Sequence, residues 1–120
     1  LSTKGTIGKL AIIGKIDNPI IASEEIQVIG LKEDKEEKAI ILYMFLKSNI
    51  GQTILSSITS GTVMPQISTV EVKSLGIPKL TEENEKTILL NFNNEIEMYN
   101  KINHLEQEIE KIHNNFLGAI

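Results

Sequence analysis

The chain contains no cysteine, no tryptophan and no arginine. The lack of cysteine excludes disulfide bonds and thiolate metal sites. The lack of arginine removes the side chain best suited to bidentate hydrogen bonding of guanine, which counts against sequence-specific recognition of nucleic acid. Aromatic residues make up only 4% of the chain, so its core must be mainly aliphatic.

The chain also lacks a long hydrophobic run. Its longest strongly apolar stretch spans residues 39–46, far short of the roughly 20 residues that cross a bilayer. No basic segment followed by an apolar one opens the chain, so we expect a cytoplasmic protein without a membrane partner. The first residue is Leu1 rather than methionine, and we therefore expect a piece of a longer protein.

The composition suits one small folded domain. Of the 120 residues, 41% are hydrophobic and 23% are charged, which permits a modest core and argues against disorder. The net charge of −4 is unevenly distributed: residues 1–80 carry nine lysines and eight acidic residues, whereas residues 81–120 carry three lysines and eight glutamates. The first part is therefore the better candidate for an anionic partner.

The pattern of residues 1–80 predicts a mixed α/β domain, that is, an α+β fold. Two extended stretches, 6–13 and 20–29, flank a turn signal at 17–19. Apolar residues at helical spacing then predict a helix that includes Ile40 and Phe45 and is broken by Gly51. Shorter elements are predicted at the following ranges: helices at 53–58 and 69–75, and a strand at 75–77.

The last third predicts one long coiled-coil helix, so we divide the chain into residues 1–80 and 81–120. Thr81 is a suitable N-cap, and the glutamates in the following turn interact favourably with the positive N-terminal end of the helix dipole. No glycine or proline then interrupts the chain before Gly118, which predicts a helix from Glu82 to about Leu117.

This helix has two apolar stripes. The proximal stripe, which we expect to dock on residues 1–80, contains Ile88, Phe92, Ile96 and Tyr99. The distal stripe follows the alternating four- and three-residue spacing of a helix-pairing seam. Its members are Met98, Ile102, Leu105, Ile109, Ile112 and Phe116. The spacing leaves open whether the paired helix runs parallel or antiparallel, and packing along one core is the alternative explanation.

Catalytic and metal-binding patterns are weak, so we expect a chain that is not an enzyme and has no cofactor or metal. His104 and His113 are nine positions apart, without a second histidine at ligand spacing. Glu71 and Lys73 form the E-x-K pattern of many metal-dependent nucleases, with Asp34 as a further carboxylate. Because E-x-K arises often by chance, a nuclease is only an alternative hypothesis.

Two segments resemble the type I restriction-modification specificity subunit family, including its target recognition domain. The first segment comprises TKGTIGKLAII at residues 3–13 and IIASEEIQVI at residues 20–29. The second runs from residue 42 to 88 and reads LYMFLKSNIGQTILSSITSGTVMPQISTVEVKSLGIPKLTEENEKTI. The order of these motifs carries the resemblance, which covers nearly the whole chain. The acidic start of the long helix departs from the glutamine that family members commonly have there.

The resemblance implies a component that gives a restriction-modification complex its DNA sequence specificity. It implies a mixed α/β recognition domain that places loops on double-stranded DNA, followed by a conserved spacer helix. Methyltransferase subunits dock on such an assembly, the restriction subunit joins them, and the spacer helices of two halves pair antiparallel. Since the family has further strands before the first segment, this chain resembles the C-terminal part of one recognition domain plus its spacer helix.

Physical chemistry places the candidate DNA contacts on two glycine-containing loops rich in donors and positive charge. Lysines would neutralise phosphates, while Gln66 and the hydroxyl groups would read base edges. The simpler explanation is that lysines at segment ends are solvated and that Ser, Thr and Gly make turns and caps. The candidates are Thr3, Lys4, Thr6 and Lys9 in the first loop and Ser60, Thr62, Gln66 and Ser68 in the second.

A second function class remains open from the residues alone. The chain would then be a protein-interaction module, a truncated or half specificity subunit that does not bind DNA independently. Its partner would be a second copy or a second half-subunit, held through the C-terminal helix. Substitutions in the loops would be harmless to such a module, whereas a charge within the distal stripe would disable it.

Overall fold

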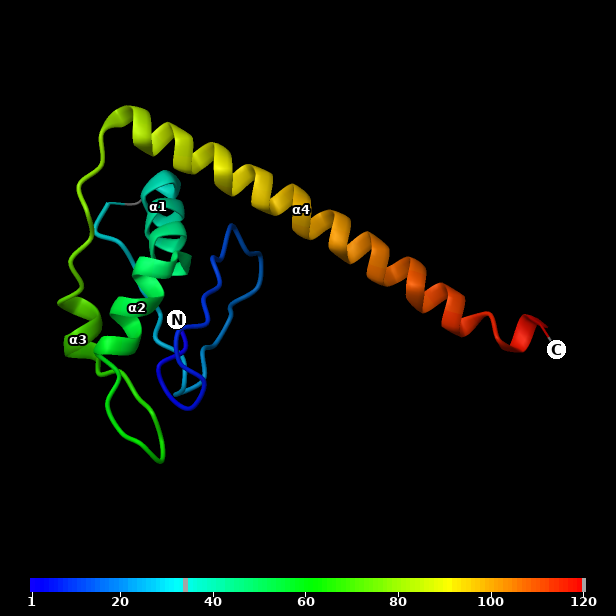
Figure 1. The fold of residues 1–120 in the computed structure, drawn as a ribbon, viewed down its shortest axis with the longest axis horizontal. Helices are drawn as coiled ribbons and strands as arrows, with labels where there is room; N and C mark the ends of the chain where they lie inside the picture. The colour runs from blue at the N-terminus through cyan, green and yellow to red at the C-terminus, as the bar shows by residue number, and fades with distance from the viewer. Residues whose placement is uncertain (34, 120) are drawn as a thin grey trace.

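The computed structural model describes residues 1–33 and 35–119, and it consists of a small lobe from which one long helix extends (Figure 1). The elements are α1 (Glu36–Lys47), α2 (Asn49–Ser57), α3 (Thr69–Lys73), α4 (Glu82–Asn114) and the short 3₁₀ helix η1 (Leu117–Ala119). Asp34, which belongs to the nuclease hypothesis, lies outside the described residues. Within the described part, no helix combines the length and the apolar character that a membrane crossing requires.

The α+β prediction is wrong, because the described residues form helices and irregular segments without a strand or sheet. The expected strands at 6–13, 20–29 and 75–77 do not form. What remains of strand pairing is a set of isolated antiparallel bridges. They join Ser2 to Ile26, Lys4 to Gln66 and Ser60 to Gln66.

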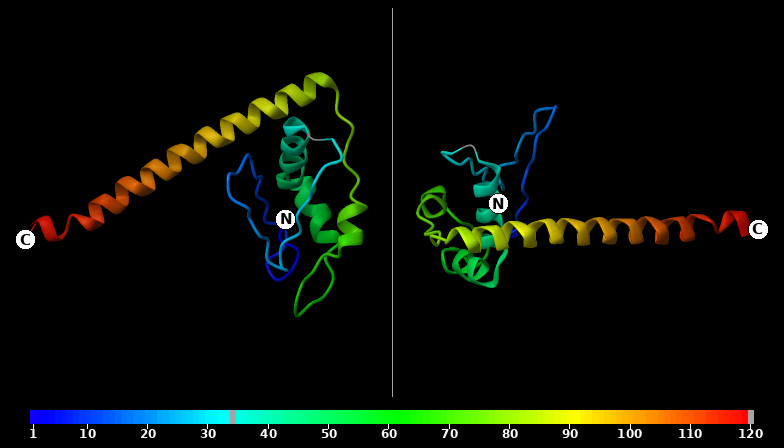
Figure 2. Two further views of the ribbon diagram at one scale, coloured as in Figure 1. Left: turned by 180° about the vertical axis from the view of Figure 1, so that it is seen from behind. Right: turned by 90° about the horizontal axis from the view of Figure 1, so that it is seen from above.

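Local geometry explains why these bridges do not extend into ladders. Gly5 and Gly8 have φ angles of 70° and 84°, and such left-handed residues turn the chain instead of continuing a strand. Between residues 10 and 24, the two extended stretches form no backbone hydrogen bonds with each other in the described structure. They make an arm that projects from the lobe (Figure 2). The alternating apolar residues were wrongly interpreted as strands, because the alternation does not supply a pairing partner.

The corner between α1 and α2 organises the lobe. Ser48 ends α1 and its side-chain oxygen accepts a hydrogen bond from the Gly51 amide at 3.1 Å, so Ser48 caps α2. The predicted break at Gly51 is therefore wrong, because Gly51 lies buried inside α2. A Cβ atom at this glycine would lie 2.1 Å from the Phe45 carbonyl oxygen. Glycine thus permits the close approach of the two helices.

A small aliphatic core lies beside this corner. Leu46 and Leu55 are each 1% exposed, and they pack with Leu1 and Ile67 from the irregular segments. The partly buried side chains around them are Ile7, Leu10, Leu42, Phe45, Ile58, Val72 and Leu75. The core therefore joins both glycine-containing loops to the helices.

The N-terminal part of α4 docks on α1 through Ile88 and Phe92 of the predicted proximal stripe, whereas its other two members, Ile96 and Tyr99, are 41% and 46% exposed. The Thr81 side chain accepts a hydrogen bond from the Asn84 amide at 3.2 Å, which confirms Thr81 as the N-cap. Tyr43 of α1 meets Phe92 of α4 edge to face at a centroid distance of 5.9 Å. Burial raises the pKa of Tyr43, and the nearby Glu95 carboxylate adds to the rise.

An ion pair fixes the start of this contact between the helices. The Lys38 ammonium group donates a hydrogen bond to Glu85 at 2.8 Å, and this bond raises the pKa of Lys38. The rest of α4 runs away from the lobe (Figure 1) and ends at Asn114, three residues before the predicted end. The proximal half therefore belongs to the lobe, and the distal half is free along its length.

Candidate nucleic-acid interface

The first candidate loop is closed by hydrogen bonds across its base. The Ser2 amide donates to the Lys9 carbonyl oxygen at 2.9 Å, and the Gly8 amide donates to the Ser2 carbonyl oxygen at 3.1 Å. The Lys9 amide also donates to the Ser2 side-chain oxygen at 2.9 Å. These bonds, together with the left-handed Gly5 and Gly8, define a tight loop over residues 2–9.

The second candidate loop is a short hairpin-like turn. Ser60 and Gln66 exchange two backbone hydrogen bonds of 2.9 Å each. Gly61 inside this turn has a φ angle of 89°, and its missing Cβ would lie 2.7 Å from the Met64 carbonyl oxygen. A glycine is therefore needed at the turn for both backbone conformation and space.

These two loops lie side by side, although they are distant in the sequence. An antiparallel bridge joins Lys4 to Gln66. The Gly5 amide donates to the Pro65 carbonyl oxygen at 3.0 Å, and the Ile67 amide donates to the Thr3 carbonyl oxygen at 2.9 Å. Both loops lie at the end of the lobe opposite α4 (Figure 1). The structure thus brings the two sequence-predicted clusters together into one surface.

Most candidate side chains on this surface are accessible. Lys4 is half-buried, and Thr3 is only 6% exposed. The Thr3 hydroxyl group faces the Glu25 carbonyl oxygen at 3.4 Å, so it supports the loop from inside and a direct contact would require rearrangement. The exposed candidates are Thr6, Lys9, Ser60, Thr62, Gln66 and Ser68. Within the described residues, the Gln66 side-chain amide forms no hydrogen bond.

Ser68 is exposed, but its side chain caps the start of α3. Its hydroxyl oxygen accepts from the Glu71 amide at 3.2 Å, and its own amide donates to the Glu71 carboxylate at 2.9 Å. This is the reciprocal capping box of α3. Glu71, the carboxylate of the nuclease hypothesis, is therefore engaged in capping, and no cluster of metal-ligating side chains occurs in the described ranges.

Sequence reasoning missed Gln52, a residue of α2 that contacts the first loop. Its side-chain amide nitrogen lies 3.1 Å from the Gly8 carbonyl oxygen and 2.8 Å from the Leu46 carbonyl oxygen. Gln52 also lines a hollow of about 380 Å³ between α2 and the two loops. Nothing in the local sequence pattern distinguishes it from an ordinary solvent-facing helix residue.

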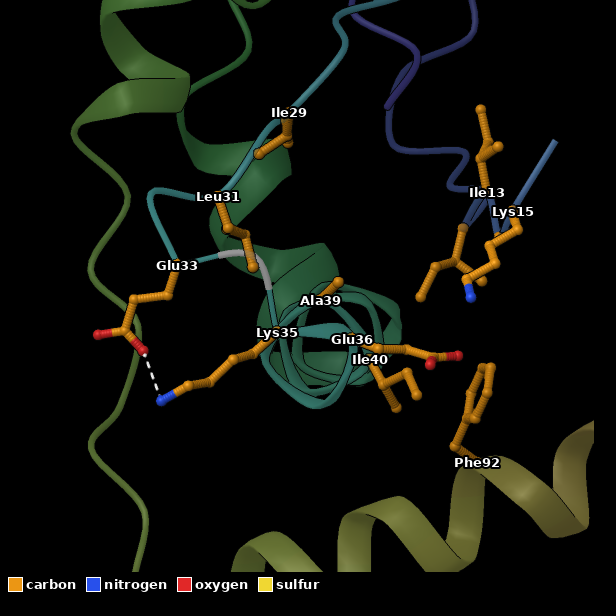
Figure 3. A pocket seen from close by; sticks show the side chains of 12 residues that line it. Ile13, Lys15, Ile29, Leu31, Glu33, Lys35, Glu36, Ala39, Ile40 and Phe92 are labelled. Atoms are coloured by element: carbon orange, nitrogen blue, oxygen red, sulfur yellow. Dashed lines mark ion pairs between the residues drawn. The ribbon is translucent and has the colours of Figure 1, made fainter. Parts of the chain in front are cut away.

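A larger hollow of about 760 Å³ lies away from the loops, between the projecting arm, α1 and α4. Ile13 of the arm, Ile40 of α1 and Phe92 of α4 contribute to its apolar walls (Figure 3). At its rim, Lys35 and Glu33 form an exposed ion pair of 3.2 Å. Lys15 and Glu36 also line this hollow, and no histidine or serine is among its described lining residues.

The distal stripe of α4 is uncovered in the isolated chain. Its six predicted members are between 48% and 72% exposed. Met98, Ile102, Leu105, Ile109 and Ile112 lie on α4, whereas Phe116 lies beyond its end at Asn114, so the predicted helical position of Phe116 is wrong. Exposed apolar residues that recur along one stripe of a helix are typical of a surface that another protein covers.

The family comparison agrees with the resemblance of the two segments. A search of curated proteins and a search of solved structures each found no match. The family model of the type I restriction modification DNA specificity domain, by contrast, matches residues 1–111. Specificity domains of this kind are non-catalytic parts of restriction-modification systems. The predicted resemblance is confirmed, and the chain belongs to the type I restriction modification DNA specificity domain family.

Proposed function

We propose that the chain recognises double-stranded DNA through its two adjoining loops and docks on other subunits of a restriction-modification complex through α4. The observation that carries the proposal is the antiparallel bridge between Lys4 and Gln66, which joins the two predicted contact clusters. Membership of the specificity family supports the same role. The proposal makes this chain the recognition element of the complex and leaves the chemistry to its partner subunits.

The loop surface has the residue types that DNA contact requires. Lys4 and Lys9 would neutralise phosphates and fix the register of the protein on the duplex. Gln66 carries an exposed amide that matches the donor and acceptor pattern of adenine in the major groove. Thr6, Ser60 and Thr62 would add hydroxyl contacts. Because arginine is absent, adenine-containing sites are favoured over guanine contacts in this proposal.

The salt dependence of duplex binding tests the phosphate contacts. Replacing Lys9 by alanine should weaken binding to all duplexes and reduce the slope of log affinity against log salt by about 0.9. The matched control is Lys86→Ala on α4, which should change neither quantity because Lys86 lies on the spacer helix. Fluorescence anisotropy with a mixed-sequence duplex measures both. Wild-type binding that does not vary with salt would reject the proposal.

Base reading is tested separately with Gln66→Ala. Selection from a randomised duplex library should show a preference at one base pair that this variant relaxes, with a loss of about 1–3 kcal/mol of discrimination. Affinity for non-specific duplexes should stay unchanged, because phosphate contacts are intact. A variant that keeps the full preference would remove Gln66 from the reading surface.

The distal half of α4 is proposed to pair with another helix. The uncovered apolar stripe supports pairing with a second copy or with a second half-subunit, and the family resemblance favours the antiparallel arrangement. The methyltransferase subunit would dock on this assembly, and the restriction subunit would join it. If the loops prove dispensable while the stripe is essential, the chain is instead a protein-interaction module without independent DNA binding.

A further inference from the structure

One side chain of α2 forms hydrogen bonds both to the first candidate loop and to the end of α1. The Gln52 amide nitrogen donates to the Gly8 carbonyl oxygen at 3.1 Å and to the Leu46 carbonyl oxygen at 2.8 Å. The last carbonyl groups of a helix lack partners within it, so the second bond also satisfies the end of α1. Both amide hydrogens of Gln52 are thereby used to join the loop to the α1–α2 corner.

The backbone at Gly8 lies so close to the Gln52 side chain that there is little room for a larger residue there. Gly8 is buried, its φ angle is 84°, and a Cβ atom there would lie 2.9 Å from the Gln52 side-chain oxygen. Gly5, in the same loop, has open space at the equivalent point. The constraint from the helix therefore acts at Gly8, immediately before Lys9.

We infer that Gln52 is a positioning residue for DNA recognition. This inference rests on the proposed function of the loops. The Gln52 amide holds residues 6–9 in register with the Lys4–Gln66 bridge, so that the lysines of the first loop and the amide of the second face the duplex together. Gln52 itself contributes no phosphate contact. Loss of the Gln52 amide therefore removes a restraint on the first candidate loop without removing a positive charge.

The variant Gln52→Met tests this inference, because methionine has a similar size and no amide group. The matched control is Thr53→Val, since the Thr53 hydroxyl group donates a hydrogen bond within α2, to the Asn49 carbonyl oxygen at 2.8 Å. Duplex affinity of Gln52→Met should fall roughly three- to tenfold, the loss expected for hydrogen bonds of ordinary strength. The salt slope should stay at the wild-type value because no lysine is lost. Thr53→Val should match the wild type in both.

Amide hydrogen exchange of the folded variants provides a readout that does not depend on DNA. In Gln52→Met, the amides of residues 6–9 should exchange faster while those of α1 stay protected. Unchanged duplex affinity in Gln52→Met, or a reduced salt slope, overturns the positioning role. Absence of DNA binding by the wild type would instead reject the proposed function, and loop exchange would still test the Gln52 contact.

Discussion

At the scale of single residues, close backbone approach decides more than side-chain chemistry. Gly51 lies against the carbonyl oxygen of Phe45, and Gly61 lies against that of Met64. Both positions read as ordinary turn or helix-breaking glycines in the sequence. Their constraint is the space left by backbone a few residues away, at the α1–α2 corner for Gly51 and within the turn for Gly61.

Gly51→Ala should destabilise the lobe by about 2 kcal/mol or more, because the added methyl group must displace backbone at the corner of α1 and α2. Chemical denaturation followed by circular dichroism measures the free energy of unfolding. The control is Gly76→Ala, where a Cβ atom would meet nothing within 4 Å. Gly76→Ala should be neutral or slightly stabilising. Equal stability of the two variants would contradict the close approach at Gly51.

At the scale of elements, the helices were predictable and the strands were not. Caps and periodicity act within a few residues, so Thr81 and the distal stripe marked α4 correctly. A strand needs a partner that the local pattern does not provide, and the stretches at 6–13 and 20–29 form isolated bridges or none. The eight candidate contact residues were selected by type. Their meeting through Lys4 and Gln66 is a long-range event that only the fold reveals.

The N-cap of α4 can be tested alone. Thr81→Ala removes the acceptor for the Asn84 amide and should cost about 1 kcal/mol of unfolding free energy. Thr87→Ala serves as the control, since the Thr87 hydroxyl group bonds to the Glu83 carbonyl oxygen within the helix interior. Alanine is favoured at such interior positions, so the control should be neutral or stabilising. A control that lost as much stability as Thr81→Ala would argue against a specific cap.

Helix pairing is tested by placing a charge in the distal stripe. Ile109→Asp should abolish self-association, because an unpaired carboxylate would be buried in the seam. The control Gln107→Asp adds the same charge on the side of the helix away from the stripe and should leave association intact. Sedimentation velocity over a range of concentrations measures the effect. Equal behaviour of both variants would mean that the stripe is not the pairing surface.

At the scale of the whole molecule, the two proposed functions occupy opposite regions. The loop surface lies at the end of the lobe away from α4, and the distal stripe lies beyond the point where α4 leaves the lobe (Figure 1). The charge distribution follows the same division, since all eight glutamates of residues 81–120 lie on α4. Acidic character on α4 would keep it from competing for the phosphate backbone.

Hydrogen–deuterium exchange of the intact chain, with and without a mixed-sequence duplex at low salt, tests this division most directly. The account predicts that DNA slows exchange in residues 4–9 and 60–68 and leaves residues 98–116 unchanged. Protection along the distal half of α4, or none in the two loops, would contradict it.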